Sequence, residues 1–445
     1  MLAAMPASHN SSPQATVVAR GSGDACPGTL RLHAADDGAL ARIRIPGGVL
    51  SVPQAGALAD VAQRLGDGDL HLTSRGNVQV RGLEDGCGGE LAAALDAAGL
   101  LPSPPHERVR NIVASPLSGL DGRGRTDVRP WLTALDAGLC ASAATPSLSG
   151  RFLFALDDGR GDVAALGADV TVRATGDGGA ELALGAHPEA LRVSEEDAPR
   201  AALTAAETFL KAASANEGRV WRVTELPLNG AEFLELVAAA LTVGGLPHER
   251  VDRAPASTPG PPPGVIGDSL SVHVPLGRLS AAQWRGLAAL AALAAGELRL
   301  TPWRGVVLPT SAPPPDPVLD GVAADGLVVD PGSPWPRVGA CIGSPGCAKS
   351  RADVRADAAA ALAATGPRGL PLYWSGCERR CGHPPGDRID LVAVPEGGYR
   401  VSTAVAEAEP RTTTMAGPTA PGPGVAGQPG NLEQALAAAL AAIAP

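Results

Sequence analysis

Regular spacing of hydrophobic residues begins near Leu30 and predicts a mixture of strands and helices. Residues 41–45 (ARIRI) alternate polar and apolar side chains, which is typical of a strand. Residues 54–65 (QAGALADVAQRL) repeat their apolar positions with helical spacing and stop before Gly66, so we expect a helix there. Residues 69–80 (DLHLTSRGNVQV) alternate on both sides of residues 74–77 and predict two short strands.

The same succession of patterns returns later in the chain. Residues 271–275 predict a strand, residues 280–295 a helix and residues 296–308 a strand pair. The segment 68–80 matches 296–308 at a constant offset of 228, and IPGG at 45–48 matches VPLG at 274–277 at an offset of 229. The matched positions are Gly68 with Gly296, Leu70 with Leu298, Leu72 with Leu300, Thr73 with Thr301 and Val78 with Val306. We infer an internal duplication whose two copies pack about a pseudo-twofold axis.

The intervening and final segments alternate strand-like and helical patterns. RFLFALDD, DVTVRA, AELALG and RVWRVTEL, all within 150–226, predict strands, and residues 200–214 and 230–242 predict helices. Residues 388–402 predict a hairpin, and residues 431–443 predict a short helix that begins at an asparagine cap.

These patterns divide the chain into seven expected parts. They are a disordered N-terminus (1–20), a first half-domain (21–90), a first lobe (100–250), a Pro-rich linker (251–268), a second half-domain (269–320), a second lobe with the clustered cysteines (330–402), and a disordered tail with a short helix (403–445).

Composition excludes several classes of protein. The formal net charge of −10 disfavours broad nucleic-acid binding, which needs a basic face. No uninterrupted run of 18 apolar residues is present, and the N-terminus lacks the basic start of a secretory signal, so we expect a cytoplasmic protein. Lysine occurs only at Lys211 and Lys349, which means that an isolated arginine carries little information here.

Four of the seven cysteines form the most informative motif. They are Cys341-x5-Cys347 and Cys377-x3-Cys381. Thiolates bind iron–sulfur clusters or zinc, but zinc sites usually separate paired cysteines by two to four residues. The glycine-rich five-residue spacer favours a loop around a larger object, so we predict a 4Fe–4S cluster. A zinc site and inert buried cysteines are the alternatives, and Cys26, Cys87 and Cys140 are expected to be incidental.

The residues around these cysteines resemble a known family. CIGSPGCAKS (341–350) and SGCERRCGHP (375–384) are similar to the cluster motif of the sulfite and nitrite reductase superfamily, as are LTSRGNVQVRGL (72–83), RNIVASPLSG (110–119) and SGRFLFALDDG (149–159). The resemblance implies an α+β fold with duplicated ferredoxin-like half-domains and two sulfite/nitrite-reductase-type α/β lobes. ACPG (25–28) with ARIRIPGGVLS (41–51) is most similar to the precorrin-3B synthases of aerobic cobalamin biosynthesis within that superfamily.

The resemblance also implies roles for three arginines. Four basic residues face the substrate anion in siroheme reductases, and three of them correspond to Arg75, Arg110 and Arg151. The fourth corresponds to Leu153, which weakens a site for a small dianion. Arginines can also hold the propionates and acetates of a tetrapyrrole through paired hydrogen bonds. A second departure is Tyr373, where synthase-type relatives often have histidine.

Three classes of function therefore remain open. The first is an O2-dependent monooxygenase that hydroxylates precorrin-3A, with the 4Fe–4S cluster, a non-haem iron whose ligands the sequence does not reveal, and an external electron donor such as a ferredoxin or reductase. The second is a siroheme-dependent sulfite or nitrite reductase, in which Cys381 would bridge cluster and haem. The third is a non-enzymatic iron–sulfur electron carrier.

Overall fold

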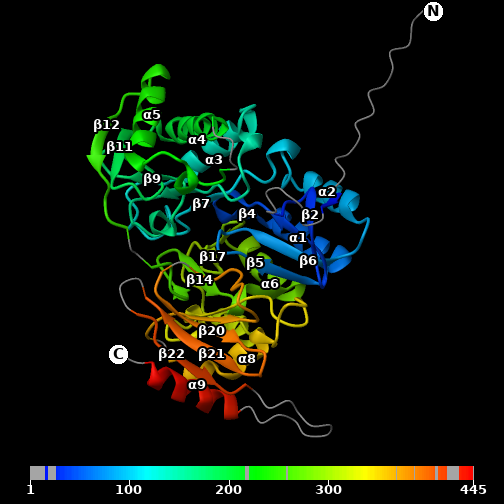
Figure 1. Ribbon diagram of the computed structural model, residues 1–445. Coiled ribbons are helices and arrows are strands. Elements are labelled where there is room, and N and C mark those ends of the chain that lie inside the picture. The colour runs from blue at the N-terminus through cyan, green and yellow to red at the C-terminus, as the bar shows by residue number, and fades with distance from the viewer. Residues whose placement is uncertain are drawn as a thin grey trace, which may run out of the picture.

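The protein folds into four β-sheets within the part of the chain that the computed structural model describes. Figure 1 shows two sheets in the middle of the molecule, a first lobe at one end and a second lobe at the other. No helix in that part is long and apolar enough to cross a bilayer. The described residues are 16–18, 27–215, 220–256, 259–366, 368–384, 386–405, 409–417 and 430–443.

Apart from β1, the two central sheets have equivalent strand orders. The first runs β1-β2-β3-β6-β5-β15 and the second runs β13-β14-β17-β16-β4. The first contains β1 (Thr16–Val18), β2 (Arg31–Ala35), β3 (Gly38–Ile43), β6 (Val78–Leu83), β5 (Asp69–Leu72) and β15 (Arg278–Ser280). The second contains β13 (Gly264–Val265), β14 (Ser269–His273), β17 (Gly305–Pro309), β16 (Glu297–Leu300) and β4 (Val49–Ser51). The duplication predicted from the sequence is thus present in three dimensions.

Each half donates one short strand to the other half. β4 of the first half pairs with β16, and β15 of the second half pairs with β5. Glycines precede both exchanged strands because the chain passes very close to its partner there. Gly48 has φ 73° and an added Cβ would lie 2.0 Å from the carbonyl oxygen of Leu300, while the equivalent Gly277 has φ 70° and lies against Leu72.

One helix from each half covers the joint core. α1 (Val52–Leu65) and α6 (Ala281–Ala292) begin with equivalent capping boxes, Ser51 with Gln54 and Ser280 with Gln283. The buried indole of Trp284 donates to the carbonyl oxygen of Ala55 over 2.7 Å, which joins the two helices. α2 (Gly88–Ala97) and α7 (Asp316–Ala324) lie at the ends of the two half-domains.

The first lobe has a six-stranded sheet in the order β12-β11-β10-β9-β8-β7. Its strands are β7 (Ile112–Ala114), β8 (Phe154–Asp157), β9 (Val170–Ala174), β10 (Gly179–Leu184), β11 (Glu189–Ser194) and β12 (Glu249–Asp252). The helices α3 (Arg129–Ala141), α4 (Ala198–Ser214) and α5 (Gly230–Val243) pack against one another and the sheet around a core that includes Phe152, Phe154 and Phe209.

The second lobe repeats this arrangement in the order β18-β19-β20-β21-β22. In both lobes the first three strands are parallel and the next two are antiparallel. The strands are β18 (Val338–Ala340), β19 (Leu372–Ser375), β20 (Arg388–Ala393), β21 (Tyr399–Ala404) and β22 (Thr412–Met415), and the helices are α8 (Val354–Ala360) and α9 (Gly430–Ala442). The duplication therefore extends to the lobes, which the sequence did not reveal.

Three local predictions differ from the structure. Residues 1–20 were expected to be disordered, but Thr16–Val18 form β1, which pairs with β2. RVWRVTEL was expected to be a strand, but its described part forms a short 3-10 turn at Val223–Glu225, because Asp169 binds the backbone N–H of Val223 and the guanidinium of Arg222. Residues 403–430 were expected to be disordered, but β22 within them pairs with β21. The expected helix at 431–443 is present as α9 and packs on the same lobe. Most of the segment 1–26 and residues 418–429 lie outside the described residues.

Candidate functional site

The four motif cysteines lie on two loops that leave neighbouring parallel strands. Cys341 directly follows β18, and Cys377 comes two residues after β19. Because β18 and β19 pair in parallel, their carboxyl ends meet at one edge of the sheet, where binding sites of such sheets usually lie. The backbone N–H of Gly376 donates to Sγ of Cys341 over 3.3 Å, which joins the two loops at the sulfur itself.

The environment of Cys341 fits a metal-bound thiolate. Burial raises the pKa of this thiol and the nearby Cys381 and Cys377 raise it further, while the N–H groups of Gly376 and Gly343 lower it. A thiolate here therefore needs a positive partner such as iron. Gly376 admits no side chain, because an added Cβ would lie 1.8 Å from Oγ of Ser350.

The spacing of the cysteines disfavours a single zinc ion, because zinc sites usually separate paired cysteines by two to four residues and five residues separate Cys341 from Cys347. A 4Fe–4S cluster held by the four cysteines would supply one-electron transfer.

The loop from Cys377 to Cys381 is held from both sides. The hydroxyl of buried Tyr373 donates to the carbonyl oxygen of Cys381 over 2.5 Å. Arg380 has a positive φ of 45°, which is unusual for a residue with a side chain, and its guanidinium donates to buried Asp390 over 2.9 Å. Tyr373, which stands where relatives often have histidine, is therefore an anchor for the last cysteine.

Two of the three predicted arginines line one pocket. Arg75 and Arg151 face a cavity of about 340 Å³ together with Arg42 and Arg44, and no acidic side chain is among its eight described lining residues. The carbonyl oxygen of Gly150 accepts from Arg44 over 3.1 Å and from Arg75 over 3.4 Å, which draws the loop of Arg151 toward the first half-domain. The guanidinium of Arg151 lies 4.5 Å above the ring of Trp221.

The third predicted arginine lies elsewhere. Arg110 is buried and makes two 2.7 Å hydrogen bonds to the carboxylate of Asp136, and it is not among the lining residues of the pocket. Its neighbour Asn111 instead joins the lobe to the half-domain, because its amide accepts from Asn77 over 3.1 Å. The structure thus brings Arg75 and Arg151 together and gives Arg110 a partner within the protein.

Sequence reasoning missed Arg42 and Arg44. Both were visible in the alternating strand ARIRI, but alternation alone predicts a solvated polar face. In the structure Arg44 is 2% exposed and lines the pocket rather than bulk solvent. The available signal was the alternation of these two arginines directly before the IPGG turn. It would have indicated that they face the TSRGN loop at 73–77.

Comparisons with known proteins bear on the fold of the chain. Residues 11–98 and 267–313 match the nitrite/sulfite reductase ferredoxin-like half domain. The chain is 27% identical to a precorrin-3B synthase of a Sinorhizobium species, over 88% of this chain and 85% of that protein. It is 28% identical to a ferredoxin–nitrite reductase of Synechococcus elongatus, over 78% of this chain and 74% of that protein. The structure of the Mycobacterium tuberculosis NirA protein superimposes with a TM-score of 0.67 and 20% identity, covering 84% of this chain and 77% of that one.

The half-domains of this chain thus match a nitrite/sulfite reductase family model, and the chain shares its fold with the NirA protein. The expected α+β architecture with duplicated half-domains and two lobes is confirmed. The relatives named above include a synthase and a nitrite reductase at similar identity, so similarity alone does not select one reaction.

Leu153 occupies the position at which the resemblance implies a fourth cation, and its surroundings are apolar. Its side chain is 4% exposed and packs in an apolar cluster with Val113, Ala155 and Val163. Its backbone N–H donates to the buried carboxylate of Asp169 over 2.9 Å. The position that carries the fourth cation in siroheme reductases therefore contributes to the core here.

The first lobe has a counterpart of the cysteine site at the carboxyl ends of β7 and β8. Ser115 follows β7 as Cys341 follows β18. The N–H of Asp158 donates to Oγ of Ser115 over 3.1 Å, just as the N–H of Gly376 donates to the sulfur of Cys341. The two lobes thus share one backbone arrangement with different side chains.

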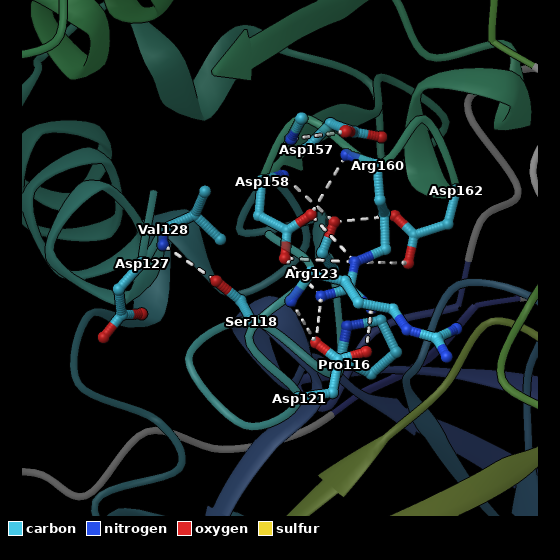
Figure 2. A network of polar contacts seen from close by, with 12 residues as sticks. Pro116, Ser118, Asp121, Arg123, Asp127, Val128, Asp157, Asp158, Arg160 and Asp162 are labelled. Atoms are coloured by element: carbon cyan, nitrogen blue, oxygen red, sulfur yellow. Dashed lines mark hydrogen bonds and ion pairs between the residues drawn. The ribbon is translucent and has the colours of Figure 1, made fainter. Parts of the chain in front are cut away.

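Arginine fills the counterpart site with an internal positive charge. Figure 2 shows Arg160 between the carboxylates of Asp158, Asp121 and Asp162. Its guanidinium binds Asp121 over 2.9 Å and Asp158 over 2.7 Å. These carboxylates therefore have a positive partner within the protein. Asp157 accepts from three backbone N–H groups, of Gly159, Gly161 and Ala164. We interpret this network as structural.

A second group of potential metal ligands lies in the first half-domain, next to Arg355 of the second lobe. Asp67, Asp69 and His71 bring ligand atoms within 4.8 Å of one another. Asp69 is paired with Arg278 over 2.5 Å, and Nη1 of Arg355 lies 3.5 Å from Nδ1 of His71. Because an arginine can only donate, Nδ1 of His71 acts as the acceptor and the proton of the neutral ring is on Nε2. Nε2 faces Asp67 at 3.7 Å. We assign no iron to these residues, so the ligands of any non-haem iron stay unplaced.

The remaining cysteines are separate from both sites. Cys87 and Cys140 are partly buried free thiols, and burial raises the pKa of each. Cys26 lies outside the described residues.

Proposed function

We propose that this protein is an oxidoreductase that acts as a precorrin-3B synthase in aerobic cobalamin biosynthesis. The observation that carries the proposal is the combination of the cysteine site with a pocket lined by four arginines, while the fourth cation of the anion reductases is replaced by Leu153 in the core. The similarity to a precorrin-3B synthase over 88% of this chain supports it.

The arginine pocket would hold carboxylates of the tetrapyrrole substrate. Four guanidinium groups around one cavity suit a ligand with several propionate and acetate side chains, since guanidinium groups form charge-assisted hydrogen bonds to carboxylates. Arg44 also donates to the carbonyl oxygens of Arg108 and Gly150. The stack of Arg151 on Trp221 would fix the direction of that guanidinium. Arg110 stays a predicted substrate contact, but it would have to leave Asp136 to act as one.

The reaction would insert one oxygen atom of O2 into precorrin-3A. The second oxygen atom would leave as water, with two electrons from an external donor such as a ferredoxin or reductase and two protons from solvent. A ring acetate would then close a lactone. Cys341, Cys347, Cys377 and Cys381 would hold the 4Fe–4S cluster through which single electrons pass.

A siroheme-dependent nitrite or sulfite reductase is the second candidate. The similarity to a ferredoxin–nitrite reductase over 78% of this chain favours it, since the identity to that protein is 28% and the identity to the synthase is 27%. A siroheme also carries eight carboxylates and would suit the same arginines. The apolar packing of Leu153 disfavours the reduction of a small anion, because one cation of that site is missing.

Pigment content separates the two candidates. We would purify the protein without oxygen, record its absorption spectrum and extract pigment with acidified acetone. We expect a broad iron–sulfur band and no extractable siroheme. Stoichiometric siroheme would overturn the proposal in favour of the reductase, and absence of any iron–sulfur band from reconstituted protein would overturn both.

Turnover tests the reaction itself. Incubation with precorrin-3A, a reductant and isotopically labelled O2 should give a product that contains one labelled oxygen atom. A product without the label, or no product from protein with a full cluster, would exclude the monooxygenase.

Substitution of the pocket arginines tests the binding site. Arg75→Ala should weaken binding of uroporphyrin III, an eight-carboxylate probe, by about tenfold or more, because a hydrogen bond to a charged group contributes about 1.5–3 kcal/mol. Arg64→Ala, which removes an exposed arginine paired with Glu90, is the matched control. Unchanged affinity in Arg75→Ala would show that the pocket does not bind the tetrapyrrole. Unchanged affinity in Arg110→Ala would show that Arg110 does not contact it.

A further inference from the structure

The cluster cysteine Cys347 is held by a different part of the chain from the other three. Cys341 is bonded to Gly376, Tyr373 anchors Cys381, and Cys377 lies on the same loop as Cys381, all within the second lobe. The residues on both sides of Cys347 instead bind the first half-domain. That contact joins segments about 265–312 positions apart in sequence.

Two hydrogen bonds flank Cys347. The backbone N–H of Ala348, directly after the cysteine, donates to Oδ2 of Asp36 over 2.8 Å. The carbonyl oxygen of Gly346, directly before it, accepts from Nη2 of Arg81 over 3.3 Å. Since both peptide groups next to the cysteine are fixed, the direction of its side chain is restricted.

Asp36 and Arg81, which form these two hydrogen bonds, are themselves held in place. Arg81 is 7% exposed and donates to both carboxylate oxygens of Asp37 over 2.8 and 2.7 Å. Asp36 and Asp37 form the turn between β2 and β3, and Gly38 closes that turn with φ 108°. The turn lies so close to the cluster loop that a Cβ on Gly346 would meet Oδ2 of Asp37 at 3.0 Å.

We propose that Asp36 and Arg81 are positioning residues that set Cys347 as a ligand of the cluster. The first half-domain would thereby complete a site whose other ligands belong to one lobe. The inference rests on the cluster assignment within the proposed function, and it holds for either reaction considered above.

The expected consequence concerns the one iron atom that Cys347 would bind. Loss of the Asp36 contact frees the N–H of Ala348 and loosens Cys347, so the iron bound to that cysteine becomes the most easily lost. Removal of one iron from a four-iron cluster leaves a three-iron form with its own electron paramagnetic resonance signal. Residues that orient metal ligands typically change metal affinity by about 10–100-fold.

The experiment compares Asp36→Ala with Asp36→Asn in the full chain after anaerobic cluster reconstitution. We would measure iron and sulfide per protein, the three-iron resonance signal and the rate of cluster loss to a chelator. Asp36→Ala should lose iron about tenfold faster and accumulate the three-iron form. Asp36→Asn, which keeps an acceptor oxygen, should restore most of the wild-type behaviour.

Asp60→Asn is the matched control. Asp60 joins the two half-domains through an exposed pair with Arg285, and that pair lies on the helices α1 and α6. The control should retain iron like the wild type. Asp36 is exposed, so its substitution should leave folding intact, and unfolding temperatures would verify this.

Equal rates of iron loss in Asp36→Ala and wild type would overturn the proposal. Equal acceleration in Asp36→Ala and Asp60→Asn would also overturn it, because the effect would then be general. A wild-type protein that takes up no cluster would instead refute the cluster assignment, which distinguishes the two failures.

Discussion

A single backbone hydrogen bond recurs at the corresponding place in both lobes, but it ends on an oxygen in one and a sulfur in the other. Ser115 receives it from Asp158, and Cys341 receives it from Gly376. The acceptor decides what the site can hold, because a thiolate is a soft ligand for iron and a serine hydroxyl is not. Around Ser115 the chain supplies the positive charge itself, as Arg160.

The buried carboxyl of Asp162 should make stability depend on pH. Burial raises its pKa to about 7, and the charge of Asp157 adds to the rise. The unfolded carboxyl has a pKa of about 3.9, so the folded state binds more protons between about pH 4 and pH 7 and the free energy of unfolding falls as pH rises through that window.

Asp162→Asn should remove much of this decline. The amide oxygen can still accept from Ser115 and the N–H of Val163. The loss of unfolding free energy between pH 5 and pH 8 should shrink by on the order of 1–4 kcal/mol relative to wild type, measured by denaturant titration at each pH. Asp197→Asn, at a partly buried carboxylate paired with Arg200, is the control. An unchanged pH slope in Asp162→Asn would contradict the prediction.

Tyr373→Phe should loosen the last cluster cysteine. The substitution removes the hydroxyl that donates to the carbonyl oxygen of Cys381. One such hydrogen bond contributes about 1 kcal/mol, so the cluster should be lost to a chelator roughly fivefold faster. Tyr399→Phe is the matched control, because it removes a buried hydroxyl bonded to Asp357 in the core of the same lobe. It should lower thermal stability and leave the rate of cluster loss unchanged.

At the scale of elements, strand exchange holds the two half-domains together. β4 and β15 each complete the sheet of the other half, so neither sheet is finished by its own repeat. The exchange depends on tight turns in which Gly48 and Gly277 have positive φ and touch a carbonyl oxygen of the partner strand. Two short strands thus convert a duplicated sequence into one structural unit.

Gly48→Ala should disrupt this unit. An added Cβ would lie 2.0 Å from the carbonyl oxygen of Leu300, and the backbone would be strained at φ 73°. We expect a loss of at least about 2–3 kcal/mol in unfolding free energy, measured by chemical denaturation. Gly56→Ala in α1, where an added Cβ meets nothing within 4 Å, should be neutral or stabilising by about 0.5–1 kcal/mol. Equal stability of the two variants would contradict the importance of the turn.

At the scale of the whole molecule, the half-domains join two lobes that have separate cores. The buried side chains of the half-domains, the first lobe and the second lobe form distinct clusters. Buried arginines make the connections: Arg299 donates to the carbonyl oxygens of Pro116 and Ser118 in the first lobe, and Arg81 donates to Gly346 in the second. Loss of the cluster should therefore affect one lobe most.

Cys377→Ser tests this separation. The variant should lose the iron–sulfur absorption band completely, because one ligand is missing. Hydrogen exchange should accelerate by about tenfold or more around β18, β19 and the cysteine loops, while the first lobe keeps its protection. Cys140→Ser, which changes a free thiol in the first lobe, is the control. An intact cluster spectrum in Cys377→Ser would refute its assignment as a ligand.

The sequence by itself determined the features that depend on short-range spacing. Hydrophobic periodicity predicted α1, α6 and the strands around them, because one buried face requires a fixed repeat. The constant offset between 68–80 and 296–308 predicted the duplication of the half-domains. The spacing of the four cysteines pointed to their loops because thiolate ligands must converge from short, glycine-rich segments.

Only the tertiary structure decided which distant residues meet. It placed Arg75 and Arg151 in one pocket with Arg42 and Arg44, and it paired Arg110 with Asp136. It also revealed that the lobes repeat one another and that Asp36 contacts the loop of Cys347. These contacts depend on how sheets dock, and docking is set by the summed burial and hydrogen bonding of many residues rather than by any local pattern.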